Sequence, residues 1–276
     1  MISYTIKGTK TIVDEKVFKD GAVNVNINIG GMDHDFDIRE VLIEAHIDSS
    51  DSILALAMTV DALKRQYPRA DLGLFMPYTP YARQDRVCNK GEALGISVFS
   101  ELINNMGFKT IVVADPHSIA TQAALRGSLV ITQYDLFADI KDSWREWTIV
   151  APDAGATKKC EEFAKRVGAK DVLTFNKVRD METIEITHLA PNRDIEPNAG
   201  GKYMVLDDIC DGGRTFIGVS EAIGSRDEFA QIELAVTHGI FSYGVDIVTD
   251  VYDHVYTTNS FRQDLVSGNK LTVIKL

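Results

Sequence analysis

One local pattern recurs along the sequence: a short apolar run, a turn containing glycine or acidic residues, and then a segment whose apolar residues have helical spacing. Alternation of this kind is typical of α/β proteins, in which helices connect the strands of a largely parallel sheet. The short apolar runs at 72–76, 110–114, 148–151, 203–206 and 232–237 are the predicted strands. The sequence therefore predicts an α/β fold.

Two helices are predicted from apolar residues that recur every three or four positions. The first covers residues 51–66, and the second covers residues 94–106 and ends before Gly107, a residue that commonly follows a helix. In the segment 21–29 apolar and polar residues instead alternate one by one. That alternation indicates a half-exposed antiparallel strand.

The chain is long enough for two domains, because 276 residues exceed the usual domain size of roughly 100 to 200 residues. Residues 133–147 are mixed in character, and the strand–turn–helix pattern starts again at Thr148. We therefore expect one domain over residues 1–138 and a second over residues 139–276. In open α/β sheets, ligands bind beyond the carboxyl ends of the strands, so the turns after the strands are the candidate sites.

Composition excludes several classes of protein. Lys and Arg number 29 against 40 Asp and Glu, and the resulting net charge of -11 repels a nucleic-acid backbone. The amino terminus lacks a signal-peptide pattern and no apolar run approaches the length of a membrane span, so we expect a cytoplasmic protein with no membrane partner. Cys88, Cys160 and Cys210 are odd in number and widely spaced, which indicates reduced thiols.

The most specific candidate site follows the predicted strand 203–206. Asp207 and Asp208 come first, and the run 211–215 (Asp-Gly-Gly-Arg-Thr) then leads into a helical segment at 216–223. A glycine-rich turn that opens a helix presents backbone N–H groups to a phosphate, and carboxylates suit the hydroxyls of a ribose or a hydrated Mg²⁺. A solvated acidic turn is the alternative, but the complete order of these residues favours a ligand.

The turn after the strand 72–76 carries Arg83 and Arg86. Their guanidinium groups match the geometry of phosphate oxygens. Asp85 lies between them, however, and could pair with either arginine in an ordinary surface loop. Spacing alone leaves both interpretations open.

Two further turns carry weaker signals. After the strand 110–114, Asp115 and His117 could share a divalent ion, although a single histidine is more often structural. After the strand 148–151, Asp153 is either a metal ligand or a turn former.

Lys177 and Arg179 lie in a stretch that loses apolar periodicity, which predicts a mobile loop. Two cations on such a loop could close over a reacting polyphosphate and neutralise its charge. The alternative is a solvated basic loop.

Taken in chain order, these turns resemble the ribose-phosphate pyrophosphokinase family, also called the phosphoribosyl pyrophosphate synthetases. The resemblance covers nearly the whole chain and implies two tandem phosphoribosyltransferase-type (type I) α/β domains with largely parallel sheets, the first on the ATP side and the second on the ribose-phosphate side. The similar stretches are 18–21, 60–65, 77–86, 115–118, 152–153, 177–179, 207–215, 237–239 and 258–260.

The resemblance also implies an activity: transfer of the β,γ-diphosphate of ATP to the C1 hydroxyl of ribose 5-phosphate, with Mg²⁺ as cofactor and in a homo-oligomer. By the family pattern, the catalytic residues are Lys177 and Arg179, the ATP-binding residues are Phe18, Asp20, Gly21, Arg83, Gln84 and His117, the ribose-phosphate-binding residues are Asp207, Asp208, Asp211, Gly212, Gly213, Arg214 and Thr215, and the metal ligands are His117 and Asp153.

The chain departs from the family pattern in the phosphate turn, where relatives place Thr at the position of Gly212 and Gly at that of Arg214. Losing a hydroxyl and gaining a guanidinium would open the site to a larger 5-substituted ribose such as ADP-ribose. Ribose 5-phosphate stays the leading acceptor, because the backbone N–H groups of the turn are retained. Ala22, Gly91 and Ala154 also replace the usual Glu, Arg and His, which removes three ionisable side chains from the family pattern.

Two other classes compete with the pyrophosphokinase. A phosphoribosyltransferase shares the acidic pair and the glycine-rich turn, but would not need the turns at 77–86 and 115–117 as well. A non-catalytic subunit of a synthetase is disfavoured because Lys177, Arg179, His117 and Asp153 are all present.

Overall fold

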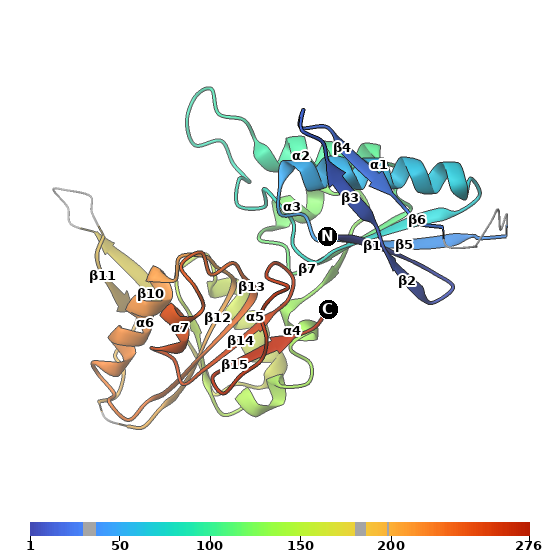
Figure 1. Cartoon of the computed structure of the whole chain (residues 1–276). Helices are drawn as coiled ribbons and strands as arrows, with labels where there is room; N and C mark the ends of the chain where they lie inside the picture. The colour runs from blue at the N-terminus through green and yellow to red at the C-terminus, as the bar shows by residue number, and fades with distance from the viewer. Residues whose placement is uncertain (30–36, 180–185, 198) are drawn as a thin grey trace. The chain divides into compact units, whose positions relative to one another are not determined.

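The computed structural model describes residues 1–29, 37–179, 186–197 and 199–276, with the backbone alone described at 141, 177–179 and 186–188. The chain divides into two compact units, Met1–Ile131 and Thr132–Leu276. Each unit combines a mainly parallel sheet with helices (Figure 1). The predicted α/β class is therefore confirmed.

The first unit is built on a six-stranded sheet in the order β2-β1-β5-β6-β7-β8. β5 to β8 run parallel to one another, and β1 pairs antiparallel with both β5 and β2. A separate antiparallel hairpin joins β3 to β4. The strands are β1 (Ile2–Ile6), β2 (Thr9–Ile12), β3 (Asp14–Val17), β4 (Val23–Asn26), β5 (Glu40–Ala45), β6 (Asp71–Met76), β7 (Thr110–Ala114) and β8 (Leu129–Ile131).

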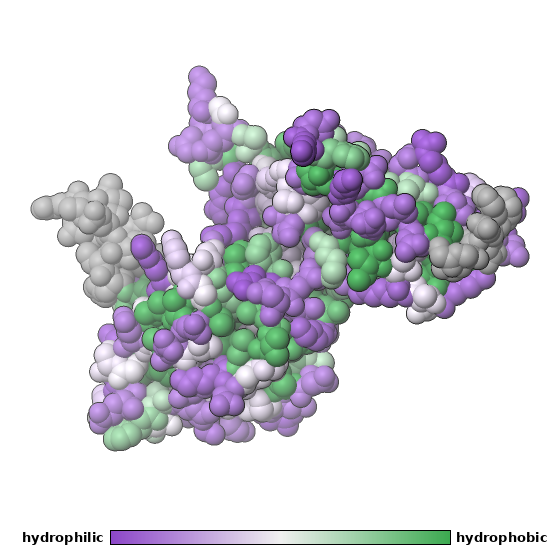
Figure 2. All heavy atoms as spheres, viewed as in Figure 1, coloured by the Kyte–Doolittle hydropathy of each residue, from purple (hydrophilic) through white to green (hydrophobic). Residues whose placement is uncertain are grey.

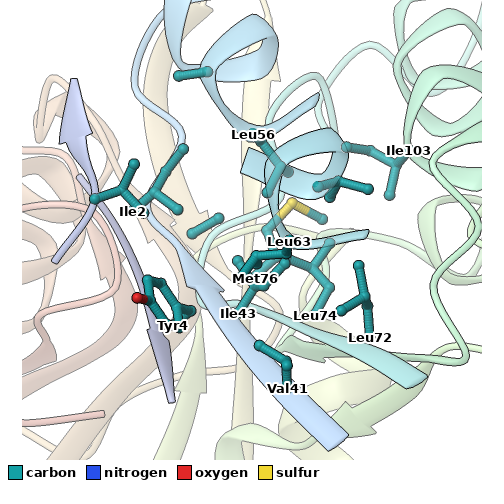
Figure 3. Packing of buried hydrophobic residues seen from close by; sticks show 14 of the residues in the cluster. Ile2, Tyr4, Val41, Ile43, Leu56, Leu63, Leu72, Leu74, Met76 and Ile103 are labelled. Carbon is teal, nitrogen blue, oxygen red and sulfur yellow. The ribbon is translucent and has the colours of Figure 1, made fainter. Parts of the chain in front are cut away.

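Three helices connect these strands: α1 (Ser50–Gln66), α2 (Gly95–Asn105) and α3 (Ile119–Ala124). α1 packs on the sheet through one apolar face, and Figure 3 shows Leu56 and Leu63 of this helix meeting Ile43, Leu74 and Met76 of the strands. All five side chains are fully buried. Removing that apolar surface from water is the main force that holds the helix against the sheet.

The second unit is built on a seven-stranded sheet in the order β11-β10-β9-β12-β13-β14-β15, parallel throughout except for β11. Its strands are β9 (Thr148–Ala151), β10 (Asp171–Arg179), β11 (Ile186–Pro191), β12 (Lys202–Cys210), β13 (Gln231–Gly239), β14 (His254–Thr258) and β15 (Leu271–Ile274). Its helices are α4 (Gln133–Leu136), the 3₁₀ turn η1 (Lys141–Trp144), α5 (Thr157–Val167), α6 (Arg214–Gly224) and α7 (Asp246–Thr249).

The predicted helices at 51–66 and 94–106 are confirmed as α1 and α2, and the alternating segment 21–29 contains β4. The unit boundary differs from the expected 138/139, because residues 132–138 pack within the second unit. There Gln133 donates a hydrogen bond to the backbone of Asp207, and the ring of Phe137 meets that of Trp144 edge to face at a centroid distance of 5.9 Å.

Two predicted turns are strands in the structure. Asp207 and Asp208 lie inside β12, which continues to Cys210 because its last residues stay paired with β13. Lys177 and Arg179 lie in β10, paired with β11 across a register shift after Val178, so the prediction of a loop at their positions was wrong. Backbone hydrogen bonding with a neighbouring strand compensated for the missing apolar periodicity.

Hydrophilic residues cover much of the face seen in Figure 2, with apolar residues scattered between them, as is normal for a folded chain. In the part of the chain that the structure describes, no helix is both long and apolar enough to cross a membrane.

Candidate functional site

The acidic pair of the second unit lies near the carboxyl end of β12. Asp208 is buried, with 6% of its surface exposed, and its backbone N–H donates to the Oδ1 of Asp207 over 2.9 Å. Burial raises the pKa of Asp207 well above its ordinary value, and the neighbouring Asp208 carboxylate raises it further. Two carboxylates held this close favour hydroxyl donors or a cation as their partner.

Gln133 of α4 supports this pair, and sequence reading did not single it out. Its side-chain N–H donates to the backbone carbonyl of Asp207 over 2.6 Å, and the residue is 2% exposed. Its Oε1 has no hydrogen-bond partner within the described residues. A buried polar atom without a partner costs free energy. This oxygen can therefore accept a hydrogen bond from a donor bound beside the acidic pair. A buried polar residue at the start of a short helix gives no signal in sequence spacing.

The glycine-rich turn connects β12 to α6, as the sequence predicted. Gly213 has φ +75°, and a Cβ at this position would lie 2.6 Å from Cδ1 of Ile247, so both conformation and space require glycine. No side chain of the described residues caps the N-terminus of α6. The first backbone N–H groups of this helix therefore remain available to an anion, at the positive end of the helix dipole.

The two residues that open α6 differ in exposure. Arg214 is exposed and Thr215 is half-buried. A guanidinium at the first position of the helix adds positive charge beside the N–H groups that would bind a phosphate.

A loop that follows β13 lies along this turn. The N–H groups of Ile240 and Phe241 donate to the carbonyl of Cys210 over 2.9 and 3.1 Å, and the N–H of Ser242 donates to the carbonyl of Asp211 over 3.2 Å. The Ser242 hydroxyl also donates to the Asp211 carboxylate. This loop was not predicted to take part in the site, because its residues match no phosphate-binding pattern.

Polar side chains also join the carboxyl ends of β13 and β14. The hydroxyl of Thr258 donates to the carbonyl of Thr237 over 2.7 Å, and Nδ1 of His238 lies 2.8 Å from the hydroxyl of Ser260. All four residues are buried. These contacts join the end of β14 to the end of β13, which is the neighbour of β12, where the acidic pair lies.

Asp153 follows β9, in the turn that leads to α5. Its Oδ1 accepts hydrogen bonds from the N–H groups of Gly155 and Ala156, over 2.9 and 3.3 Å. One carboxylate oxygen therefore acts as a turn former, which was one of the two alternatives from the sequence.

In the first unit, the turn after β6 contains the predicted arginines. Asp85 pairs with Arg86 over 3.2 Å, so the local ion pair considered from the sequence exists, whereas Arg83 presents an exposed side chain. Gln84 lies across the start of α2, since a Cβ on Gly95 would come within 2.2 Å of its Oε1. Gly95 thus leaves room for the Gln84 side chain.

His117 lies in the turn between β7 and α3 and is exposed. The turn begins at Asp115, which is buried and has φ +38°, a conformation uncommon for a residue with a side chain. The hydroxyl of Thr121, in α3, donates to the carbonyl of Ala82 over 3.5 Å, a long contact that links the two turns of this unit.

Phe18, Asp20 and Gly21 form the tip of the β3–β4 hairpin and are all exposed. The N–H of Phe18 donates to the carbonyl of Ala22, and the N–H of Gly21 donates back to the carbonyl of Phe18. Gly21 has φ +86°, which this tight turn requires.

The structure thus brings together the second-unit residues 207–208 and 211–215 at one strand end, and it places Arg83, Gln84 and His117 in turns that follow two adjacent strands of the first unit. The side chains of Lys177 and Arg179 lie outside the described residues. No group of three or more His, Cys, Asp or Glu side chains with metal-binding geometry occurs in the described ranges.

Comparison with known proteins bears first on the fold and then on the similarity to one family. A solved structure of phosphoribosylpyrophosphate synthetase from Mycobacterium smegmatis superposes with a TM-score of 0.74, covering 96% of this chain and 86% of that one at 23% sequence identity. The chain therefore has the two-unit fold of such a synthetase.

Residues 2–107 match the family model described as the N-terminal domain of ribose phosphate pyrophosphokinase. Curated relatives named ribose-phosphate pyrophosphokinase include those of Mycoplasmopsis pulmonis, 28% identical over 77% of this chain and 66% of its own length, and of Corynebacterium efficiens, 28% identical over 79% and 68%. The relative from Pyrococcus furiosus is 25% identical over 92% of this chain and 88% of its own. Residues 2–107 therefore match the N-terminal domain of this family, and the chain as a whole is similar to its members and spans about two thirds of the length of the first two of these relatives.

Proposed function

We propose that this protein transfers the β,γ-diphosphate of ATP to the C1 hydroxyl of ribose 5-phosphate, which gives phosphoribosyl pyrophosphate and AMP. The observation that carries the proposal is the strand end of β12, where half-buried Asp207 and buried Asp208 precede a glycine turn and an uncapped helix. Similarity to proteins named ribose-phosphate pyrophosphokinase supports the same activity.

In the proposed complex, the 5-phosphate accepts hydrogen bonds from the first N–H groups of α6, with Thr215 as a further donor. The ribose hydroxyls donate to Asp207 and Asp208. Held at both ends, the sugar presents its C1 hydroxyl in one orientation. Fixed orientation of the two reactants lowers the barrier without any covalent intermediate.

The C1 oxygen attacks the β-phosphorus of ATP, the bond from that phosphorus to the α-phosphate oxygen breaks, and AMP leaves. The C1 hydroxyl proton is released to solvent. Lys177 and Arg179 are the proposed catalytic residues, because negative charge spreads over the moving diphosphate and cations stabilise it there.

ATP is assigned to residues of the first unit: Arg83 and Gln84 for its phosphates, His117 beside them, and the hairpin tip of Phe18, Asp20 and Gly21 for its base. In the proposed homo-oligomer the hairpin serves a neighbouring copy of the chain.

Mg²⁺ is the proposed cofactor, with His117 and Asp153 as the protein ligands. The chemistry at the site fits a divalent cation, because carboxylate oxygens are the ligands that Mg²⁺ prefers and two carboxylates, Asp207 and Asp208, are adjacent there. When bound, Mg²⁺ neutralises charge on the diphosphate.

A second candidate acceptor is ADP-ribose, whose ribose has a free C1 hydroxyl and a diphosphate on C5. The exposed guanidinium of Arg214 at the first turn of α6 favours it, because it can contact a phosphate beyond the one held by the helix.

The test is to incubate the purified full chain with ATP, Mg²⁺ and either ribose 5-phosphate or ADP-ribose, and to measure AMP and the diphosphorylated sugar. Production of both with ribose 5-phosphate supports the leading proposal. If only ADP-ribose is turned over, ADP-ribose replaces ribose 5-phosphate as the proposed acceptor. If neither acceptor yields AMP, the enzyme assignment is overturned.

A further inference from the structure

A large aromatic side chain lies beside the phosphate turn without belonging to the core. Tyr243 is 73% exposed. A Cβ built on Gly212 would lie 3.2 Å from Cε2 and 3.6 Å from Cδ2 of its ring. The ring edge therefore lies directly over the backbone of the turn, and most of the ring surface is open to solvent.

The loop that carries Tyr243 is held firmly in place. Phe241 anchors it in the core with 1% exposure, and its φ of +48° is imposed by that packing. Gly239 leaves room for the anchor, since a Cβ there would come within 2.1 Å of the Phe241 ring. The hydrogen bonds from residues 240–242 to the backbone of Cys210 and Asp211 complete the attachment.

Glycine at 212 and tyrosine at 243 depend on each other. A side chain at 212 would press against the ring edge, and a contact of 3.2 Å obliges the ring to move. The ring of Tyr243 thus occupies the space that a side chain at position 212 would enter.

We infer that Tyr243 is a specificity-determining residue that stacks on the nucleobase of an acceptor carrying a nucleoside beyond its 5-phosphate. The inference rests on the second candidate acceptor under the proposed function and names its substrate class as a nucleoside-diphosphate-linked ribose. An exposed, fixed aromatic face suits a base, because every base has a π-face and stacking needs no hydrogen-bond code. Arg214 supplies the charge for the intervening diphosphate.

The experiment compares kcat/KM for ADP-ribose and for ribose 5-phosphate in the wild-type chain and in Tyr243→Ala. We expect the ratio of the two values to fall roughly five- to hundredfold, the range for losing one base–aromatic stack. Tyr243→Phe keeps the ring face and should keep the ratio. Phe229→Ala is the matched control, because Phe229 is also exposed but precedes β13, at the opposite end of that strand. It should leave both activities unchanged.

Gly212→Ala tests the dependence between the two positions, since its Cβ displaces the ring edge. It should lower the same ratio, and adding it to Tyr243→Ala should lower the ratio no further. An unchanged ratio in Tyr243→Ala overturns the inference.

Calorimetric binding separates this outcome from failure of the proposed function. In one outcome the chain turns over neither acceptor but binds ADP-ribose more tightly than ribose 5-phosphate, and Tyr243→Ala abolishes that difference in affinity. The stacking role of Tyr243 then stands, and the proposed reaction is overturned. Equal wild-type affinity for the two compounds overturns the stacking role, whatever the turnover.

Discussion

In the first unit, α1 and α3 follow strands and begin at serines, whereas α6 of the second unit begins at a glycine. The hydroxyls of Ser49 and Ser118 accept hydrogen bonds from N–H groups in the first turn of their helices. α6 has no such side chain among the residues described. A helix start already capped by its own serine offers fewer N–H groups to a ligand than an uncapped one.

If both units bind phosphate groups as proposed, they would do so in two different ways. At the strand ends of the first unit, ligands would meet long or ionisable side chains such as His117, beside the capping Ser118, and Arg83, in the loop before α2. The second unit instead offers its own backbone, kept accessible by Gly213. We expect substitutions in the first unit to affect the use of ATP, and substitutions in the second unit to affect the use of the acceptor.

The largest expected effect is on turnover in the second unit. Lys177→Ala should lower kcat about 10²- to 10³-fold with little change in the fold, since the lost cation stabilises charge that develops in the transition state. Steady-state kinetics and circular dichroism measure the two quantities, with Lys165→Ala on exposed α5 as control. By contrast, Arg83→Ala in the first unit should mainly raise KM for ATP. Near-wild-type turnover in Lys177→Ala would exclude its catalytic role.

Next in size is the backbone of the phosphate turn. Gly213→Ala should destabilise the chain by about 1–3 kcal/mol, because alanine resists the left-handed conformation and its Cβ meets Ile247. Denaturant unfolding measures the loss. Gly224→Ala, at the other end of α6, is the matched control, because a Cβ there has no neighbour within 4 Å among the described residues. Equal effects of the two substitutions would contradict a special role for Gly213.

A smaller effect, on pH dependence, is expected at the acidic pair. The folded state raises the pKa of Asp207, so it binds the proton more tightly than the unfolded chain does. The stabilising contribution of Asp207 is then fully present below its unfolded pKa of about 4. It falls as the pH rises from there toward the raised folded-state pKa. Asp207→Asn should therefore raise Tm by a few degrees at neutral pH and not at acid pH, while lowering turnover. Thermal unfolding across pH tests this, and a constant difference in Tm at every pH would refute it.

The smallest expected effect is at a capped helix of the first unit. Ser118→Ala removes the hydroxyl that caps α3, and should cost about 1 kcal/mol of unfolding free energy. Ser118→Thr keeps the hydroxyl and should recover most of that loss. If urea titration shows no loss of unfolding free energy in the alanine variant, the Ser118 cap does not stabilise α3. The serine cap would then not explain the difference between the helix starts of the two units.

Periodicity and turn order made much of the fold predictable. α1 and α2 were readable because buried residues such as Leu56 and Leu63 recur at helical spacing, and the start of α6 was readable because glycine has few other reasons to occur in pairs after a strand. The register of β10 with β11 was not readable, since it depends on how Leu189 and its neighbours pair with β10.

The parts of the site that escaped prediction are those formed by distant segments of the chain. Gln133 meets Asp207 across 74 positions of sequence, and the loop at 240–242 meets Cys210 only because β12 and β13 are adjacent. Contacts like these follow from strand order, and no local spacing encodes them.

The three thiols differ in solvent exposure, which allows one of them to be labelled selectively. Cys160 and Cys210 are fully buried, and burial raises the pKa of both, that of Cys210 to about 12, while Cys88 is exposed on the loop between β6 and α2. A maleimide dye reacts with accessible thiolate. At neutral pH it should therefore modify Cys88 and spare both Cys160 and Cys210. The unaltered chain can thus carry one fluorophore on the loop that also presents Arg83, and that fluorophore would report nucleotide arrival in real time.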